Sequence, residues 1–342
     1  MHENLININP KVYHLDQPEN KSDLKLDFIG DIHGYANELE NLLISLGYKP
    51  TNGIWMHPNR RAVFVGDFIN RGPFNRRVIE IIRPMVEVGS GYAILGNHEI
   101  NAICYFTLRK SKKPIQAPGP SNKKFLDKIK RDYINDLELF EDVIKWLRTL
   151  PLYINFGNVR VVHAYWSKNH IQTISKRLNG KTKLSKSFLK EVFAGGTLLS
   201  KAFMQTTKGV EFSFPPNIVV RENLRVRKIS YRVKWWINPQ NKTYAEIHYE
   251  SKVDLPDIAV PKPYILPFEI YKSTEPPVFI GHYCMGNGDM IPAPNICCVD
   301  ACAANGGHLA AYRWDGEKTL LHDKLVYFPP KVIQPNQLAG NA

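Results

Sequence analysis

The chain has 342 residues, of which 44% are hydrophobic and 23% charged, as in ordinary globular proteins. No apolar run is long enough to cross a membrane, and the polar N-terminus lacks the hydrophobic segment of a secretory signal. Five irregularly spaced cysteines argue against a disulfide scaffold and for a reducing cytoplasm. The net charge of +13 favours anionic partners, although a solvated surface without a partner explains it equally well.

The first hundred residues predict alternating strands and helices. Short apolar strands that end in turns are expected over 25–34, 60–67 and 91–99. Between them, 35–48 and 74–89 have the apolar spacing of amphipathic helices. Strands joined through helices favour parallel, right-handed crossovers.

The second half of the chain is richer in strand patterns. Residues 159–166, 276–283 and 324–328 are expected to be strands, and 225–250 alternates and is rich in aromatic residues. We therefore expect an α/β fold, a two-layered β-sandwich flanked by helices. The expected segments are a polar N-terminal extension (1–23), a single domain (24–328) with a β-rich insertion at about 195–275, and a loose C-terminal tail (329–342).

Three strands in the first half end in the same way, with a glycine and then polar residues: GDIHG, GDFINRG and GNHE. Two more histidines follow apolar runs in the second half. Because the carboxyl ends of strands form the ligand crevice of an open α/β sheet, we expect these side chains to meet at one edge. The residues are Asp31, His33, Asp67, Asn97, His98, His163 and His282.

This set of side chains predicts a metal centre. Oxygen and imidazole ligands suit Mn²⁺, Fe or Zn better than Mg or Ca, and we favour two divalent ions, Mn²⁺ first. Two ions that share a carboxylate can clamp a phosphate and lower the pKa of a water between them. Arg71 adds a planar guanidinium for phosphate oxygens, and His98 can protonate the leaving oxygen.

The three motifs resemble those of the calcineurin-like metallophosphoesterases. They are most similar to the branch of serine/threonine phosphoprotein phosphatases and symmetrical diadenosine tetraphosphatases, with motifs GDxHG, GDxVDRG and GNHE. The resemblance continues in VVHA, GHY and CVDACAANGGHLAAYRWDGE. It implies that His98 is the general acid and that Arg71 binds phosphate. It also implies one metal held by Asp31, His33 and His282, a second completed by Asn97 and His163, and Asp67 as the bridge.

The chain departs from this family at two places. Asn70 stands where the family has an aspartate that pairs with the histidine of the third motif. An asparagine can accept a hydrogen bond through its carbonyl but cannot supply the negative charge that raises the pKa of an imidazole. We therefore predict a weaker acid at His98, with a lower optimum pH or a preference for better leaving groups. HAYW replaces HGG, so Tyr165 and Trp166 either narrow the site or belong to the core.

The resemblance also implies a second phosphate-binding arginine between the last two ligand histidines. Arg232 is our candidate among the arginines of that stretch, and we predict substrate binding by Arg71, Asn97 and Arg232.

The expected function is metal-dependent hydrolysis of phosphate monoesters, most similar to that of a serine/threonine protein phosphatase. One alternative is a bis(5'-nucleosyl)-tetraphosphatase, with Tyr165 or Trp235 stacked on adenine. Another is a nucleic-acid end phosphatase that uses the basic stretches 109–131 and 176–190. A non-catalytic metal-binding scaffold is the alternative of a different class, and Asn70 is the feature that supports it. The partner would thus be a phosphorylated protein or a nucleotide, with nucleic acid possible and no membrane.

Overall fold

The computed structural model describes residues 24–330 except 217, 219, 224–225, 250–254 and 287. The expected N-terminal extension and nearly all of the expected C-terminal tail lie outside these residues. In the part described, no helix is long and apolar enough to span a bilayer.

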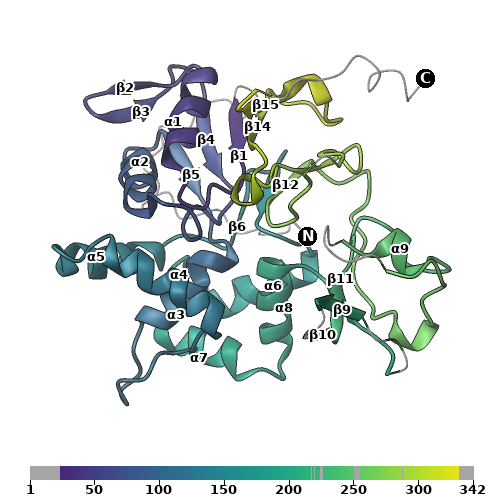
Figure 1. Ribbon diagram of the computed structural model, residues 1–342. Helices are drawn as coiled ribbons and strands as arrows, with labels where there is room; N and C mark the ends of the chain where they lie inside the picture. The colour runs from purple at the N-terminus through teal and green to yellow at the C-terminus, as the bar shows by residue number, and fades with distance from the viewer. Residues whose placement is uncertain are drawn as a thin grey trace.

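The first sheet has five strands in the order β15-β14-β1-β4-β5. β1, β4 and β5 are parallel, as predicted, and β14 pairs with β1 in the antiparallel direction. This sheet occupies the upper part of Figure 1. Its strands are β1 (Leu26–Ile29), β4 (Arg61–Phe64), β5 (Gly91–Ala93), β14 (Leu309–Trp314) and β15 (Leu325–Phe328).

The second sheet has four strands in the order β13-β12-β7-β6, of which β7, β12 and β13 are parallel. Phe28 of the first sheet stacks on Phe279 of the second, with ring centroids 3.7 Å apart. The two sheets therefore face each other, and the expected β-sandwich is confirmed. The strands of the second sheet are β6 (Tyr153–Asn155), β7 (Arg160–Val162), β12 (Val278–Ile280) and β13 (Ile296–Cys298).

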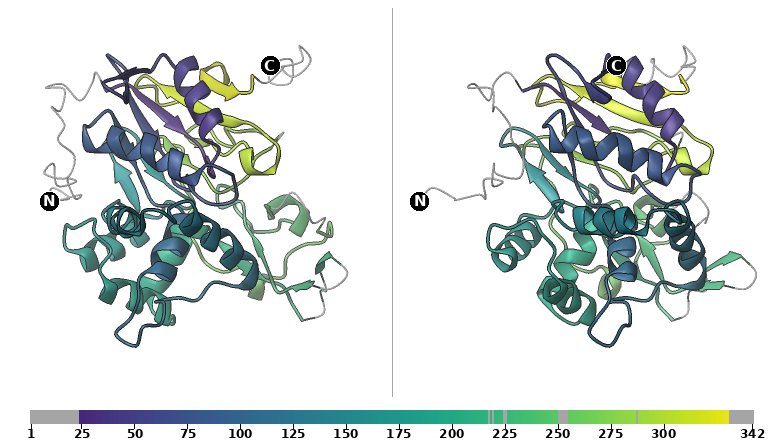
Figure 2. Two further views of the ribbon diagram at one scale, coloured as in Figure 1. Left: turned by 60° about the vertical axis from the view of Figure 1, so that its left-hand side comes forward. Right: turned by 90° about the vertical axis from the view of Figure 1, so that its left-hand side faces the viewer.

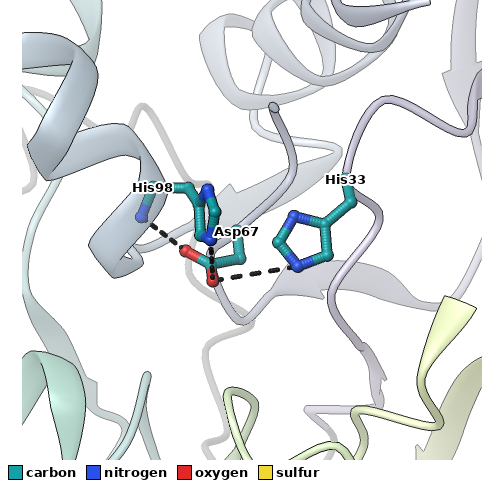
Figure 3. Close-up of side chains that lie close together, drawn as sticks. All are labelled: His33, Asp67 and His98. Atoms are coloured by element: carbon teal, nitrogen blue, oxygen red, sulfur yellow. Dashed lines mark hydrogen bonds and ion pairs between the residues drawn. The ribbon is translucent and has the colours of Figure 1, made fainter. Parts of the chain in front are cut away.

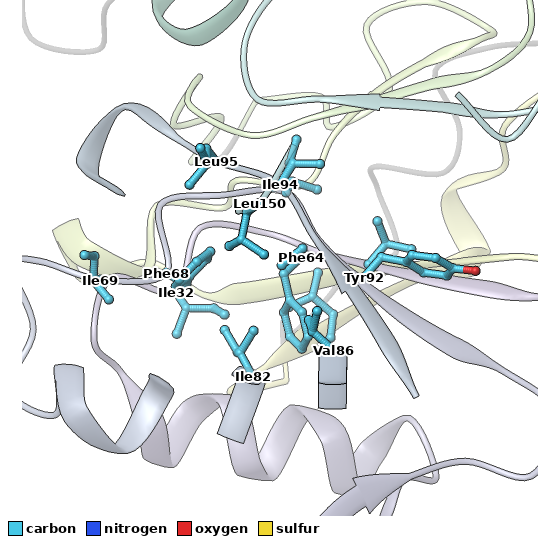
Figure 4. Close-up of a cluster of buried hydrophobic side chains, with 14 of the residues drawn as sticks. Ile32, Phe64, Phe68, Ile69, Ile82, Val86, Tyr92, Ile94, Leu95 and Leu150 are labelled. Carbon is cyan, nitrogen blue, oxygen red and sulfur yellow. The ribbon is translucent and has the colours of Figure 1, made fainter. Parts of the chain in front are cut away.

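Two of the predicted helices cover the first sheet. α1 (Ala36–Ser45) contacts β14 and β15, and α2 (Asn75–Glu87) contacts β5. Their apolar positions face inward: Ile82 and Val86 of α2 lie beside Phe64 and Tyr92 in the core of Figure 4. Burial of this stripe holds the two strand–helix crossovers in place, because each buried aliphatic side chain contributes about 1.5–3 kcal/mol.

Six further helices form a separate group, which lies below the sheets in Figures 1 and 2. The stretch 91–99 was expected to be a strand and a turn, but Asn97 begins the first of these helices. The reason is local, because the Glu99 side chain accepts the backbone N–H of Gly96 and caps the helix. The six are α3 (Asn97–Phe106), α4 (Pro120–Arg131), α5 (Leu137–Leu147), α6 (Lys168–Leu178), α7 (Lys186–Ala194) and α8 (Leu198–Lys208).

The segment 195–275 begins with a helix, α8, and continues in short paired strands. Sequence analysis also missed a hairpin formed by β2 and β3 after α1. The remaining elements are β2 (Lys49–Thr51), β3 (Ile54–Met56), β8 (Glu211–Ser213), β9 (Val220–Asn223), β10 (Val226–Lys228), β11 (Ser230–Arg232), α9 (Tyr244–Ile247), and 3₁₀ turns at Lys262–Tyr264, Ala303–Asn305 and His322–Lys324.

Three aromatic side chains that could have faced a ligand belong instead to the core. Tyr165, Trp166 and Trp235 are all buried in the same hydrophobic cluster. The Tyr165 hydroxyl donates to the carbonyl of Glu269, and the Trp235 indole donates to that of Ala164. The idea that Tyr165 or Trp235 stacks on adenine is therefore wrong.

The structure also joins Cys284 and Cys302 in a disulfide, which the irregular cysteine spacing did not predict. The pairing depends on a close approach of two loops that follow different strands. The other three cysteines are free and buried: Cys104, Cys297 and Cys298.

Candidate dinuclear metal site

Parallel strands of both sheets end at one edge, and polar side chains follow them there. The first sheet contributes residues after β1, β4 and β5, and the second sheet contributes residues after β7 and β12. The predicted set converges as expected: Asp31, His33, Asp67, Asn97, His98, His163 and His282.

Asp67 lies at the centre of this set. Its Oδ2 is 4.0 Å from Nε2 of His33, 3.8 Å from Nε2 of His98 (Figure 3) and 3.4 Å from Nε2 of His163. Its Oδ1 accepts the backbone N–H of His98 at 2.8 Å. One oxygen is thus held by the backbone, while the other faces imidazoles on two sides.

Backbone carbonyls fix how the three candidate ligand histidines present their nitrogens. His33 and His163 approach carbonyls through Nδ1, at 3.3 and 2.9 Å, and His282 does so through Nε2 at 3.0 Å. Because a neutral imidazole that donates from one nitrogen has a lone pair on the other, Nε2 of His33 and His163 and Nδ1 of His282 can bind a cation.

The structure groups His282 differently from the sequence-based expectation. We expected it with Asp31 and His33, but its ring lies 5.2 Å from that of His163, and both join Asp67 in one potential metal-binding group. The link of His282 to Asp31 is through its backbone N–H, which donates to Oδ2 at 3.1 Å. The direction in which a strand-end side chain points could not be read from the sequence.

The buried carboxylates suit a cation. Burial raises the pKa of Asp31 well above its usual range, and nearby Asp300 and Asp67 raise it further. Oδ1 of Asp31 is buried without a hydrogen-bond partner among the described residues. Several buried acidic groups around one point are costly unless positive charge balances them. The carbonyl oxygen of Asn97 lies close by, 3.2 Å from Nε2 of His163.

The charge states of the other groups also suit metal binding. Burial lowers the pKa of His33 and His282 well below the usual range, with Arg232 adding to the effect at His282. These imidazoles are therefore neutral and can act as ligands. Burial works to raise the pKa of Asp67, but the imidazoles of His163 and His98 outweigh it and hold that pKa well below its usual range. Burial works to lower the pKa of His163, but Asp67 raises it, so binding of a cation at His163 would release a proton from this ring. Together the donor set fits divalent cations.

Half of the described non-glycine residues with a positive φ lie at this site. Non-glycine residues with positive φ include His33 at 49°, Asp67 at 49°, Arg71 at 66° and His282 at 66°. Each such conformation costs on the order of 1–3 kcal/mol and persists where surrounding contacts enforce it. These unfavourable backbone conformations lower the stability of the fold, and they orient the side chains of the site.

Sequence analysis missed Glu99, which supports the turn that carries Asp67. Its carboxylate accepts backbone N–H groups from Asp67 at 2.7 Å, Gly96 at 2.9 Å and Ile69 at 3.1 Å. The available signal was its position three residues after Gly96, the spacing of a capping box. Glu99 is a positioning residue, since its oxygens are occupied by the backbone.

Asp300 was also missed. It follows β13, is buried, and accepts the backbone N–H of Cys302 at 2.9 Å. Since β13 runs parallel to β12, the strand-end rule that identified the other residues applies to Asp300 as well. Asp300 belongs to the segment CVDACAANGG, which carries part of the family resemblance, but the resemblance did not imply a role for it.

Asn70 adopts a different hydrogen bond from the one expected. Its Oδ1 accepts the backbone N–H of Arg71 at 2.9 Å, and its Nδ2 lies 2.7 Å from Nδ1 of His98. The amide therefore donates to His98 rather than accepting from it, which assigns the proton of the neutral ring to Nε2. Burial lowers the pKa of His98 to about 4. Nη2 of Arg71 lies 3.4 Å from Nε2 of this ring, and with the proton on Nε2 this approach is not a hydrogen bond.

Arg232, the candidate second arginine, lies at the same edge. Its guanidinium stands over the ring of Tyr283, 5.5 Å from the centroid, and contributes to the lowered pKa of His282. Its Nε is buried without a hydrogen-bond partner among the described residues. The guanidinium is thus held next to the centre with unused donor capacity.

Comparison with known proteins bears on this geometry. A model of the calcineurin-like phosphoesterase family matches residues 24–233. The chain belongs to the calcineurin-like phosphoesterase family. An asymmetrical bis(5'-nucleosyl)-tetraphosphatase PrpE of Oceanobacillus iheyensis is 35% identical over 149 residues, 42% of this chain and 56% of that protein. The protein of the same name from Geobacillus is 43% identical over 76 residues, which are 22% of this chain and 31% of that protein.

The alignments thus span about half of the first of these phosphoesterases and a third of the second. Two solved structures resemble the chain at low sequence identity. A putative diadenosine tetraphosphatase is 16% identical, with a TM-score of 0.38 over 89% of this chain and 94% of that one. A serine/threonine phosphatase from Saccharomyces cerevisiae is 15% identical, with a TM-score of 0.44 over 92% and 82%.

Proposed function

We propose that this chain hydrolyses phosphoric esters or anhydrides at a centre that needs two divalent metal ions. The position of Asp67 carries the proposal, because it is shared by the group with His33 and His98 and the group with His163 and His282. Two ions bound there would lower the pKa of a water between them and polarise the phosphoryl oxygens.

We assign the ligands from the lone pairs that the structure leaves available. Asp31 and His33 would hold one ion, while Asn97, His163 and His282 would hold the other and Asp67 both. The mixture of carboxylate, amide and imidazole favours Mn²⁺, with Fe or Zn as alternatives. The orphaned Oδ1 of Asp31 and the hydrogen-bonded tautomers of the three histidines support this assignment.

Arg71 and Arg232 are the proposed phosphate-binding residues. Their planar guanidinium groups can each contact two phosphoryl oxygens, and both flank the group around Asp67. A phosphoryl group bound by Arg71 would lie against Nε2–H of His98, which can donate a hydrogen bond to the leaving oxygen.

The contact between Asn70 and His98 supports an anhydride as the substrate. With a pKa of about 4, His98 carries little positive charge near neutral pH. A phosphoseryl ester expels an alkoxide, which needs strong proton donation. A polyphosphate anhydride expels a phosphate whose own second pKa is about 6, so it needs little. We therefore propose a dinucleoside polyphosphate, the substrate class named for the relatives, in preference to a phosphoprotein.

Two further parts of the proposal concern partners and location. The net charge of +13 supports an anionic substrate, and the basic stretches on α4, α6 and α7 are where nucleic acid would bind if it is the partner. A location in the cytoplasm is supported by the three buried free cysteines, whereas the Cys284–Cys302 disulfide counts against it.

The test compares substrates on protein loaded with Mn²⁺, with Asp67→Asn as the blank. We expect kcat/KM for diadenosine tetraphosphate to exceed that for a phosphoserine peptide, with para-nitrophenyl phosphate as the reference for the centre alone. A preference for the phosphopeptide would assign the chain to protein dephosphorylation. Absence of any turnover, with two metal equivalents bound, would leave the scaffold alternative.

A further inference from the structure

A polar pocket of about 370 Å³ lies between α3, α7 and α8, and its lining residue Lys208 connects it to the proposed metal centre. α3 begins at Asn97 and α8 ends at Lys208. The carbonyl of Lys208 accepts the hydrogen bond from Nε2 of His282. Both helices thus have one end at the centre, and the pocket extends away from it along them.

Three helices and a loop line the pocket, and α7 contributes Val192 and Phe193. Ser200, Met204 and Lys208 follow one another at four-residue spacing on α8. On α3, Asn101 lies one turn beyond Asn97, and Cys104 follows on the same side. The loop before α4 closes the pocket and contributes the Gln116 side chain, with Asn122 from the first turn of that helix.

Lys208 is the charged residue nearest to the centre in this pocket. Its side chain is partly buried, and its charge contributes to the lowered pKa of His98. Among the described residues, no acidic side chain lines the pocket. Burial lowers the pKa of Lys208, and the charge of Glu211, which is outside the lining, works against that effect. A partly buried cation shared by an amide-lined pocket and a proposed phosphate-binding centre can serve an anionic ligand that reaches from one to the other.

We propose that this pocket binds the nucleoside end of the substrate, with Lys208 holding the adjacent phosphate. The inference rests on the proposed function and assigns the part of the protein that distinguishes a nucleotide from a simple phosphate. Asn101, Gln116 and Asn122 carry amides that both donate and accept, as the edges of a base and a ribose require. Met204 offers an adaptable apolar contact for the ring.

The size of the pocket supports the same occupant. Pockets for small molecules enclose about 300–1,000 Å³, so 370 Å³ accepts one nucleoside with its first phosphate. The other half of a dinucleotide would remain outside on the basic surface. The pocket would therefore orient the substrate so that one end of the phosphate chain reaches the centre.

The experiment measures binding by calorimetry on the full chain in metal-free buffer, with ATP and inorganic tripolyphosphate as ligands. Lys208→Met should weaken the binding of both ATP and tripolyphosphate by about tenfold or more, because it removes a charge-assisted contact to phosphate. The backbone carbonyl that accepts the hydrogen bond from His282 is retained in this variant. Met204→Trp fills the pocket. It should weaken the binding of ATP about tenfold and leave the affinity for tripolyphosphate unchanged. Lys201→Met, the same change at an exposed position of α8, is the matched control and should alter neither.

Unchanged ATP affinity in both Lys208→Met and Met204→Trp would overturn the proposal. Equal weakening of ATP and tripolyphosphate by Met204→Trp would overturn the nucleoside assignment. If Met204→Trp does not fold by circular dichroism, Gln116→Ala in the exposed loop tests the same contact. If the protein hydrolyses phosphoric esters but these binding effects are absent, the pocket assignment is rejected and the proposed function stands. If the binding effects are present but nothing is hydrolysed, the proposed function is rejected and the pocket assignment stands.

Discussion

The side-chain amide of Asn70 donates to Nδ1 of His98 across 2.7 Å, with its orientation set by the backbone N–H of Arg71. A donor at this position disfavours the imidazolium form, because a protonated Nδ1 would meet N–H groups instead of a lone pair. The ring next to the centre is therefore neutral, with its proton on the side of Arg71.

Replacing Asn70 with aspartate should favour the protonated form of His98 instead of the neutral one. A carboxylate at Nδ1 stabilises the imidazolium and should raise the pKa of His98 by about 1–3 units. The limb of the pH–rate profile that reports protonated His98 should then move to higher pH, and slow leaving groups should gain most. The measurement is kcat against pH for phenyl phosphate and para-nitrophenyl phosphate. An identical profile for Asn70→Asp would contradict the idea, and Asn52→Asp on the exposed hairpin is the matched control.

Glu99→Gln should weaken metal binding without removing a ligand. The neutral side chain keeps one acceptor but turns an NH₂ group toward backbone N–H donors, which costs about 1–3 kcal/mol at a buried site. The turn carrying Asp67 should loosen, and the metal dissociation constant should rise in a titration followed by calorimetry. Glu138→Gln, at an exposed position, should bind metal as the parent does. Equal affinities for Glu99→Gln and the parent would show that the turn holds without the carboxylate.

Gly281→Ala should disturb the centre from the backbone side. A methyl group there would collide with Oδ1 of Asp31 and approach Val65. We expect a loss of metal affinity together with a lower melting temperature, since neither neighbour can move without shifting its strand end. Gly119→Ala places its methyl group in open space, and we expect its metal affinity and melting temperature to match the parent. Normal metal binding by Gly281→Ala would show that Asp31 is not held where we describe it.

Metal binding should stabilise the fold through mass action. At a free concentration one hundred times the dissociation constant, one bound Mn²⁺ adds about 2.7 kcal/mol to the free energy of unfolding. Urea unfolding with Mn²⁺ and with a chelator measures this difference, which Asp67→Asn should largely abolish. A metal effect of full size in Asp67→Asn would place the binding site elsewhere.

Low pH should also destabilise the fold at Asp315, which does not belong to the proposed metal centre. Although burial works to raise it, hydrogen bonds from Lys324 and Arg60 lower the pKa of Asp315 to about 2 from an ordinary 3.8. A carboxylate with a depressed folded-state pKa stabilises the fold above its ordinary value, and the contribution is lost as the pH falls toward 2. Urea midpoints measured from pH 5 to 2 should fall less steeply for Asp315→Asn than for the parent. Asp257→Asn, at an exposed position, should follow the parent.

The sequence predicted the side chains of the centre but not how they are arranged. Glycine-terminated strands identified Asp31, Asp67 and the others because parallel strand ends share an edge whatever the details of packing. The same rule covered Asp300, which was overlooked. The grouping of His282 and the position of Arg232 depend on how two sheets and an insertion pack together, and local patterns carry no information on that.

The elements were predicted best where one local force dominates. The crossovers around α1 and α2 follow from apolar periodicity, whereas the helix beginning at Asn97 depends on one capping carboxylate. Lys208 could not have been singled out, because its importance comes from the end of α8 meeting a strand end that is 74 residues away in the chain. The aromatic core around Trp235 was likewise decided by tertiary packing.

The stacked pair of Phe28 and Phe279 joins two sheets whose strand ends both supply the centre. Asp67 comes from one sheet and His163 from the other, so an ion bound by both residues would connect the two sheets across their interface. Separation of the sheets would then require release of the ion. In native-state hydrogen exchange, the amides of β4 and β7 should slow together when Mn²⁺ is added, while those of the hairpin β2–β3 should exchange at their original rate.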